Sequence, residues 1–157
     1  MDFVVNIKML YPGVNMPEYK SIGASGVDLS AILYGFDFNN YVIPDGGVEV
    51  EPGAIIKIYT GISIRIPEGY EGQIRSRSGL AVNHGICVVN SPGTIDSDYS
   101  GELIVGLINL SKDYYSIDKY DRIAQLVFAP VARAEFCNVT ELEKTVRGAG
   151  GFGSTGK

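Results

Sequence analysis

The stretch IKIYTGISIRI, residues 56–66, decides the fold class of this chain. Its isoleucines alternate with polar or aromatic residues, and Gly61 is the interruption of that pattern. An alternation of period two puts the apolar side chains on one face of an extended backbone, which is typical of a half-buried β-strand. The stretch therefore predicts strands on both sides of Gly61.

Similar segments of strand length lie on both sides of this stretch, with Gly and Pro between them. We expect further strands at 3–10, 26–33, 70–75, 86–90, 103–110, 122–129 and 133–139. The segment 103–110, LIVGLINL, is apolar on both faces and predicts a central strand. The segment 122–129 also fits a helical stripe, but it is short for a helix before Pro130. With one short helical turn at most, at 78–83, the pattern predicts an all-β barrel or sandwich.

The composition is that of one folded domain. The chain has 157 residues, of which 45% are hydrophobic and 20% charged. No apolar run is long enough to span a membrane, and Asp2 does not suit a signal peptide. The two cysteines, Cys87 and Cys137, predict buried thiols in a reducing compartment, so we expect a cytoplasmic location. The net charge of −5 argues against a long nucleic acid as ligand, whereas one nucleotide needs only a few local cations.

The last eleven residues, RGAGGFGSTGK, include five glycines. Residues 148–153 imitate a dinucleotide fingerprint and residues 151–157 most of a P-loop, but no helix follows either. Glycines free the backbone N–H groups to surround an anion, and Arg147, Ser154 and Thr155 add donors. We therefore expect a domain at 1–146 and a mobile arm at 147–157. A disordered end without a ligand is the alternative.

Three other segments concentrate polar residues where strands should end: SGVDLSA at 25–31, RSRSGLA at 75–81 and GTIDSDYSGE at 93–102. Arg75 and Arg77 are suited to bidentate pairing with phosphate oxygens, and Asp96 to taking a proton from water. Together with the arm, these segments suggest hydrolysis of a phosphate ester. A solvated strand edge and ordinary turn chemistry are the alternatives. A single histidine, His84, disfavours a Ser-His-Asp triad and a structural zinc site, and we interpret it as structural.

These three segments, with YDRIAQLV at 120–127 and the arm, resemble the five motifs of the trimeric dUTP pyrophosphatases, or dUTPases. They come in the family's order and span residues 25–156. The resemblance implies a distorted jelly-roll subunit in a homotrimer with shared active sites. It also implies Mg²⁺-dependent hydrolysis of dUTP to dUMP and pyrophosphate, which lowers dUTP and supplies dUMP for dTMP synthesis. A dCTP deaminase of the same fold and a non-catalytic nucleotide-binding trimer are the alternatives.

The resemblance also implies a role for each matching residue. Asp96 is the implied catalytic base for the water that attacks the α-phosphorus, and Tyr99 is the ring that packs against the deoxyribose. Mg²⁺ would be held by phosphates and waters without a direct protein ligand, and Asp28 would lie near it. The other implied substrate contacts are Arg77, Ser78 and Gly79 on the phosphate chain, Asn90, Gly93, Thr94 and Ile95 around uracil, Gln125 on the α-phosphate, and Arg147, Phe152, Gly153, Ser154 and Thr155 in the arm.

Three residues depart from the family pattern. Ser76 stands where many members have Pro, Tyr120 where Gly is common, and Ala149 where Glu is common. None of the three removes an implied catalytic group.

Overall fold

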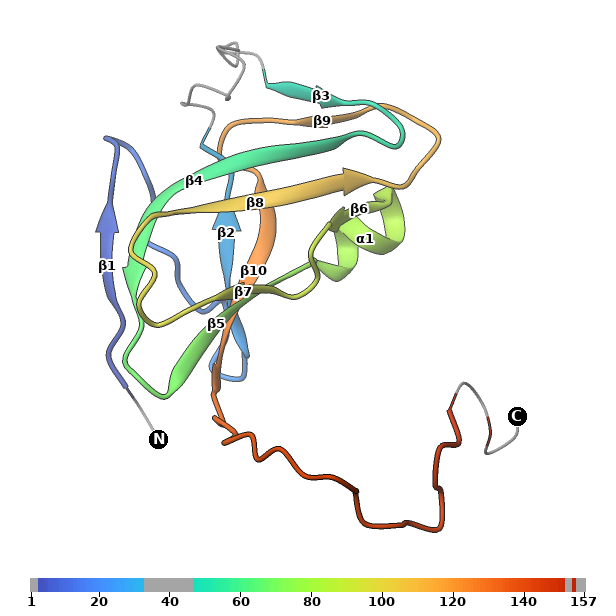
Figure 1. The fold of residues 1–157 in the computed structure, drawn as a ribbon. Coiled ribbons are helices and arrows are strands. Elements are labelled where there is room, and N and C mark those ends of the chain that lie inside the picture. The colour runs from blue at the N-terminus through green and yellow to red at the C-terminus, as the bar shows by residue number, and fades with distance from the viewer. Residues whose placement is uncertain (1–2, 33–46, 152–153, 155–157) are drawn as a thin grey trace.

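Two four-stranded antiparallel sheets and a two-stranded sheet form the body of the chain (Figure 1). The computed structural model describes residues 3–32, 47–151 and 154. The first sheet has the order β1 (Asn6–Met9), β4 (Ile55–Arg65), β8 (Glu102–Asn109) and β6 (Ile86–Val88). The second has the order β2 (Gly26–Ser30), β10 (Arg122–Pro130), β5 (Tyr70–Arg75) and β7 (Gly93–Ile95). The small sheet pairs β3 (Val48–Val50) with β9 (Tyr115–Ile117).

Strands that are distant in the sequence are neighbours in both large sheets. β10 pairs with β2 on one side and with β5 on the other, and β8 pairs with β4 and β6. Each of these pairs is antiparallel. The expected all-β, jelly-roll class is confirmed, and segment 122–129 is a strand rather than a helix.

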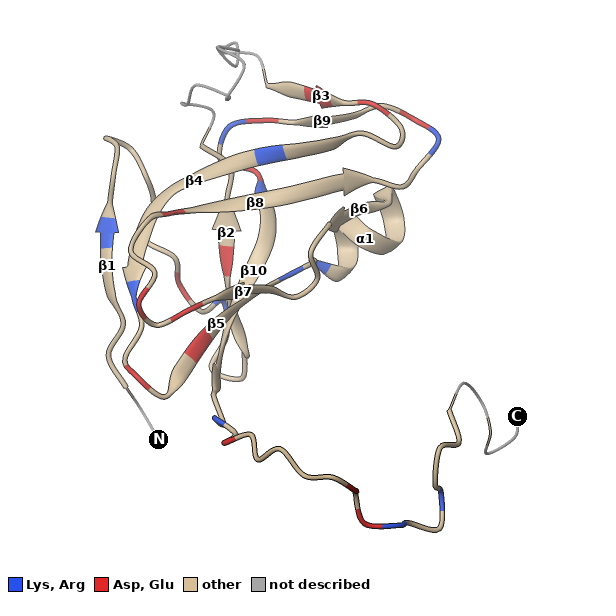
Figure 2. Ribbon diagram, viewed as in Figure 1, with Lys and Arg blue, Asp and Glu red and all other residues tan. Residues whose placement is uncertain are grey.

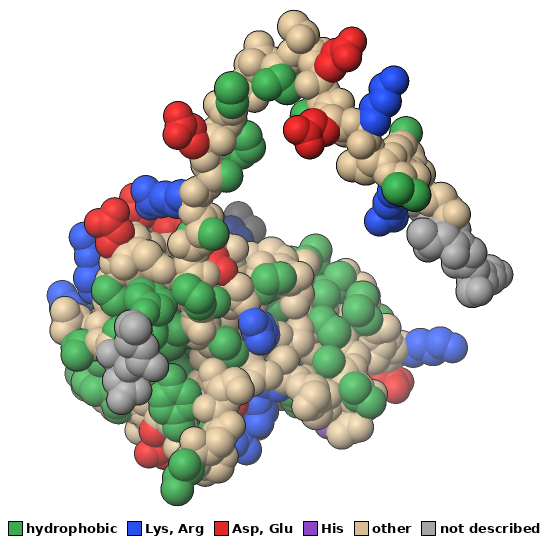
Figure 3. Space-filling view, turned by 90° about the horizontal axis from the view of Figure 1, so that it is seen from below, with side chains coloured by type: hydrophobic (Ala, Val, Ile, Leu, Met, Phe, Trp, Pro, Cys, Tyr) green, Lys and Arg blue, Asp and Glu red, His purple; other side chains and the backbone are tan. Residues whose placement is uncertain are grey.

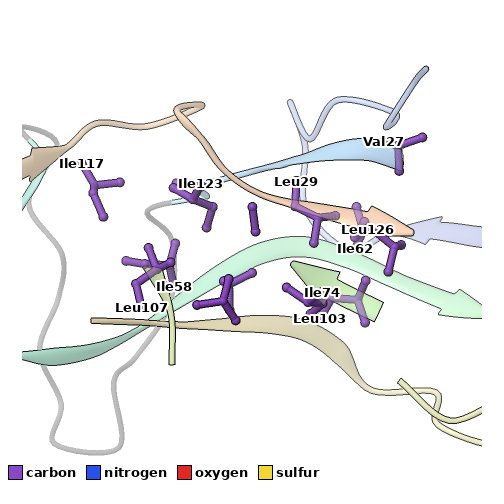
Figure 4. Packing of buried hydrophobic residues seen from close by; sticks show 14 of the residues in the cluster. Val27, Leu29, Ile58, Ile62, Ile74, Leu103, Leu107, Ile117, Ile123 and Leu126 are labelled. Atoms are coloured by element: carbon purple, nitrogen blue, oxygen red, sulfur yellow. The ribbon is translucent and has the colours of Figure 1, made fainter. Parts of the chain in front are cut away.

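The core lies between the two large sheets (Figure 4). Side chains of both sheets meet there, among them Ile58, Ile62, Leu103 and Leu107 from the first and Leu29, Ile74, Ile123 and Leu126 from the second. In β8, residues 103, 105, 107 and 109 are buried and the residues between them are half-buried. β8 lies between β4 and β6, so the prediction of a central strand at 103–110 is confirmed.

Gly61 does not end a strand, in contrast to our expectation. β4 runs through it as one strand of 11 residues, and the pairing with β8 shifts register between Tyr59 and Ser63. Gly61 has a φ of +71°, and a Cβ there would lie 2.5 Å from a methyl carbon of Val14. The glycine thus allows a β-bulge at which the first sheet approaches the loop that contains Val14.

The short helical turn expected at 78–83 is a helix, α1 (Ser78–His84), and it is the one helix among the described residues. It ends at Gly85, whose φ of 70° is the left-handed conformation that glycine adopts readily. The ring of His84 lies 5.1 Å from that of Tyr115 in β9. This contact holds the end of the helix against the small sheet.

The strand predicted at 133–139 is absent, so that prediction is wrong. After β10 the chain leaves the body as an extended tail, defined here as residues 131–151 and 154 (Figure 1). Phe136 is 96% exposed, and Cys137 is exposed as well, so the expectation of two buried thiols holds only in part for half-buried Cys87. Neither thiol is in a disulfide. Within the part of the chain that the structure covers, no helix has the length and apolar character needed to cross a membrane.

Candidate active site

Two arginines converge on one carboxylate at the edge of the second sheet. Arg77 Nε lies 3.0 Å from Asp28 Oδ1, and Arg122 Nη1 lies 3.0 Å from Asp28 Oδ2. Arg77 Nη1 also donates a hydrogen bond to the carbonyl oxygen of Arg122, at 2.7 Å. The Asp28 side chain is only 19% exposed, whereas that of Arg122 is half exposed. Two cations against one anion leave a positive charge at the surface, which is suited to a phosphate group.

Strand pairing produces this cluster. Asp28 in β2 lies opposite Gln125 in β10, and Gln125 lies opposite Arg75 in β5. Arg77 lies two residues after the end of β5, and Arg122 begins β10. The sequence alone did not predict a role for Arg122, although this residue stands in the motif at 120–127. Lysines and arginines are otherwise spread over many elements (Figure 2).

Arg75 and Arg77 do not act as a pair. Arg75 is exposed and donates two hydrogen bonds to the Gln73 side chain of its own strand, whereas Arg77 turns toward Asp28. Ser78 and Gly79 follow Arg77 at the start of α1, and both are exposed. Gly79 has open space around it, since a Cβ there would meet nothing within 4 Å. The cluster of Arg77 and Arg122 around Asp28 thus adjoins Ser78 and Gly79, the implied phosphate contacts.

The structure explains two of the three departures from the family pattern. The Ser76 hydroxyl accepts the Val88 N–H at 2.8 Å, which links the segment 75–81 to β6. Tyr120 has a φ of 72°, a conformation that glycine adopts without strain and tyrosine rarely adopts. Its N–H donates to the carbonyl of Ala31 at 2.8 Å, and this bond helps to hold the strained turn. Nothing in the structure explains Ala149.

Gln125 and the segment after β6 are the next predicted contacts. Gln125 Nε2 donates to the carbonyl of Ser76 at 3.0 Å, so it supports the loop that precedes Arg77. Gly93 is buried, and a Cβ there would lie 3.1 Å from the Asn90 amide nitrogen. Glycine therefore leaves room for the Asn90 side chain. Thr94 is exposed and Ile95 half-buried, both in β7 beside β5.

Asp96 and Tyr99 lie in the turn between β7 and β8. Asp96 is exposed, and its carbonyl accepts the Tyr99 N–H at 3.1 Å. The Tyr99 hydroxyl donates to the carbonyl of Glu102 at 2.8 Å. The turn therefore presents a carboxylate and an aromatic ring on the same short segment.

The described part of the arm folds on itself. Arg147 Nε donates to the carbonyl of Gly150 at 3.0 Å, and the Ser154 N–H donates to that of Gly151 at 3.0 Å. Phe152, Gly153 and Thr155 lie outside the described residues. Their implied contacts therefore stay predictions.

The predicted residues thus form three groups in one chain: the cluster around Asp28, the turn with Asp96 and Tyr99, and the arm. Among the residues that the structure describes, no hydrogen bond or ion pair joins Asp96 or Tyr99 to Asp28 or Arg77. Asp28 and Arg122 line a cavity of about 270 Å³. Asp98, from the Asp96 turn, lines a different one of about 440 Å³ with Arg65 and Arg133.

Comparisons with known proteins agree on one family. A sequence model of the dUTPase family matches residues 14–156. A deoxyuridine 5′-triphosphate nucleotidohydrolase of Desulfotalea psychrophila is 52% identical over 143 residues, which cover 91% of this chain and 88% of that protein. One from Syntrophotalea carbinolica is 47% identical over 152 residues, covering 97% and 96%.

Solved structures agree with these relatives. A variant of the dUTPase from Staphylococcus bacteriophage 80alpha superposes with a TM-score of 0.81 at 28% identity, covering 98% of this chain and 99% of that one. The same phage enzyme with dUpNHpp gives a TM-score of 0.78 at 27% identity, with the same coverage. The chain belongs to the dUTPase family. Its activity is accordingly that of a dUTP diphosphatase, an enzyme of nucleotide metabolism.

Proposed function

We propose that the chain hydrolyses dUTP to dUMP and pyrophosphate by in-line attack of water on the α-phosphorus, with Mg²⁺. The observation that carries the mechanism is the convergence of Arg77 and Arg122 on Asp28. Phosphate cleavage depends on positioning and charge neutralisation more than on a covalent nucleophile. In the proposed reaction Asp96 orients the attacking water and accepts its proton. The nucleotide dUpNHpp bound to the phage relative supports a deoxyuridine triphosphate as substrate.

The cluster around Asp28 would bind the phosphate chain. Asp28 holds both guanidinium groups in place, so their remaining N–H donors are preorganised for phosphate oxygens. Ser78 and Gly79 would contribute donors beside Arg77, and Gln125 would contact the α-phosphate. Asn90 and residues 93–95 would contact uracil. In the arm, Arg147, Ser154 and Thr155 would hold the γ-phosphate, and Phe152 would cover the base.

The donor set around Asp28 suits a metal ion that keeps its water. Both carboxylate oxygens of Asp28 already accept hydrogen bonds from arginine, so we propose that this side chain does not bind the ion directly. Mg²⁺ retains several waters and binds well to phosphates, and it would supply further charge neutralisation when bound. The protein's part is then to hold the phosphate chain in place.

The expected cytoplasmic location stays a prediction.

We also propose a homotrimer in which each active site combines groups from different chains. The separation of the three groups in one chain supports this. Figure 3 shows apolar side chains along the arched tail and on the face of the body seen in that view. In the tail, Phe136, Leu142 and Val146 are each more than 80% exposed. Apolar area of this extent is stabilised by burial, and neighbouring copies of the chain would bury it.

The assembly can be tested by mixing two inactive chains. One chain has Asp96→Asn, and the other lacks residues 147–157. Because shared sites take the turn and the arm from different chains, some sites in mixed trimers would be complete, and part of the activity should return. Light scattering should report a trimer at micromolar concentration. A fully active monomer would exclude this assembly.

A variant at Tyr99 tests the proposed sugar contact. If the ring fills the space beside C2′, Tyr99→Ala should raise kcat/KM for UTP relative to dUTP, because a steric block to the 2′-hydroxyl is removed. Steady-state kinetics with both nucleotides measures the ratio. An unchanged ratio would count against the sugar-contact role of Tyr99.

A product assay decides between the proposed reaction and its alternatives. Pyrophosphate release should be fast with dUTP and slow with UTP, dTTP and dCTP. Ammonia release from dCTP would indicate a deaminase instead. Binding of dUTP without turnover in the presence of Mg²⁺ would indicate a non-catalytic nucleotide-binding protein.

A further inference from the structure

The Tyr99 side chain folds back over the residues that follow it. Its hydroxyl donates to the carbonyl of Glu102, three residues on, at 2.8 Å. The residue is 42% exposed, so the ring lies at the surface and is not fixed by burial in the core. Its position therefore depends on Gly101 and Glu102, which lie beneath the tip of the ring.

Gly101 leaves the space that the tip of the ring occupies. A Cβ at this position would lie 2.5 Å from Tyr99 Oη and 2.7 Å from Cζ, closer than real Cβ contacts come. Gly101 is exposed and is not among the glycines with positive φ, so its backbone conformation suits alanine. The absence of a side chain at 101 is thus required by the Tyr99 ring and not by the backbone.

Glu102 is a fixed acceptor for the Tyr99 hydroxyl. Its Oε1 accepts the Gly61 N–H at 2.8 Å, at the bulge of β4, and its Oε2 accepts the Tyr11 hydroxyl at 3.2 Å. Burial, and then the negative charge of Glu102, raise the pKa of Tyr11, so this hydroxyl stays protonated as a donor at neutral pH. Both oxygens of the carboxylate are thus tied to other parts of the body.

β4 also holds the backbone on both sides of Tyr99. The Ser63 hydroxyl donates to the carbonyl of Ser100 at 2.7 Å, and Arg65 Nη1 lies 3.4 Å from that of Asp98. The backbone of the turn is thereby restrained at several points. The remaining freedom of Tyr99 is the swing of its ring, which the contact with Gly101 and the bond to Glu102 restrict.

We infer that Gly101 and Glu102 form a seat that fixes the Tyr99 ring and thereby sets how strongly the site excludes a 2′-hydroxyl. The inference rests on the proposed function, in which Tyr99 packs against the deoxyribose. Gly101 and Glu102 are positioning residues, because they act through the ring. A ring held at its tip cannot swing aside for a ribonucleotide, whereas a ring displaced from its seat can.

The test compares Gly101→Ala with the unaltered chain in steady-state kinetics on dUTP and UTP. We expect kcat/KM for UTP relative to dUTP to rise about tenfold, while kcat for dUTP stays within about threefold of its normal value. Gly23→Ala is the matched control. A Cβ at Gly23 meets nothing within 4 Å and its φ is not positive, so this ratio should not change.

A second variant removes the bond without adding a clash. Tyr99→Phe should raise the ratio of kcat/KM for UTP to that for dUTP by about threefold, because the ring keeps its space but loses the hydroxyl that donates to the Glu102 carbonyl. Combined with Gly101→Ala, it should give less than the product of the two effects, since both act on the tip of the same ring. Thermal midpoints of all variants monitor the fold.

The outcomes separate this inference from the proposed function. If the unaltered chain hydrolyses dUTP and discriminates against UTP, an unchanged ratio of kcat/KM for UTP to that for dUTP in Gly101→Ala overturns the inference that Gly101 and Glu102 fix the ring. An equal loss of activity on both nucleotides overturns it too, because it indicates a general structural role. If Gly101→Ala does not fold, the Tyr99→Phe ratio decides alone. Absence of dUTP turnover by the unaltered chain would instead overturn the proposed function.

Discussion

We expect Asp96→Asn to lower kcat for dUTP by about 10² or more and to leave nucleotide binding intact, since a fall of this size is typical of the loss of a general base. The substitution keeps the size of the side chain and removes its capacity to accept a proton. The side chain is exposed, and the hydrogen bond from Tyr99 goes to the Asp96 main chain, so the turn should keep its shape. Single-turnover kinetics and binding of a non-hydrolysable triphosphate measure the two quantities separately.

The same turn offers a control. Asp98→Asn removes an equal charge two residues away, and the Asp98 carbonyl that lies near Arg65 belongs to the main chain. We expect nearly normal kcat for this variant. Equal losses in both variants would attribute the effect to lost charge in the turn, and near-normal kcat in Asp96→Asn would exclude a base at this position.

We expect deletion of residues 147–157 to abolish most turnover and to leave the thermal midpoint almost unchanged. No described residue of this segment belongs to the buried core, so the fold loses little with it. Ordering each residue of the arm costs about 1–2 kcal/mol in backbone entropy, and glycine loses the most. A triphosphate would offset this cost through several charge-assisted hydrogen bonds, and the proposed closure of the arm would then exclude bulk water from the reaction.

A comparison of ligands with different numbers of phosphates tests whether the triphosphate orders the arm. The arm should become ordered with a triphosphate analogue and less so with dUMP, which lacks the terminal phosphates that Arg147, Ser154 and Thr155 are proposed to hold. Hydrogen exchange of the arm reports this directly. Normal turnover after the deletion would reduce the arm to an inert end, and a large fall in the thermal midpoint would make it part of the fold.

Sequence patterns predicted the longer strands whose partners lie in the same chain, but not the three-residue strands β3, β7 and β9. β4 and β8 have alternating burial because each has a core on one face. The sequence of β4 contains this alternation, whereas the sequence of β8 is apolar on both faces and predicted a central strand. The segment 133–139 has similar residues, but it pairs with no strand among the residues that the structure describes. A strand requires a hydrogen-bonded neighbouring strand, and the sequence of a segment does not show whether such a neighbour lies beside it. For the same reason, the prediction that the Cys137 thiol is buried was wrong.

Motif order predicted most of the candidate site, and long-range pairing supplied what was missing. Asp28 and Arg77 could be singled out because they stand in recognisable segments. The role of Arg122 depends on the pairing of β10 with β2, which brings together residues 94 positions apart. Gly101 shows the same limit, since only the position of the Tyr99 ring explains why a side chain is excluded there.

The tail leaves the body of the chain directly after β10, and this position has an evolutionary consequence. The core is complete without the tail, so substitutions there barely affect whether a newly made chain folds. If the tail joins copies of the chain as proposed, selection can act on the tail for that recognition while it acts on the strands for stability. The two requirements fall on different residues, and two co-expressed relatives could diverge in their tails, and so avoid mixing, while they keep the same body.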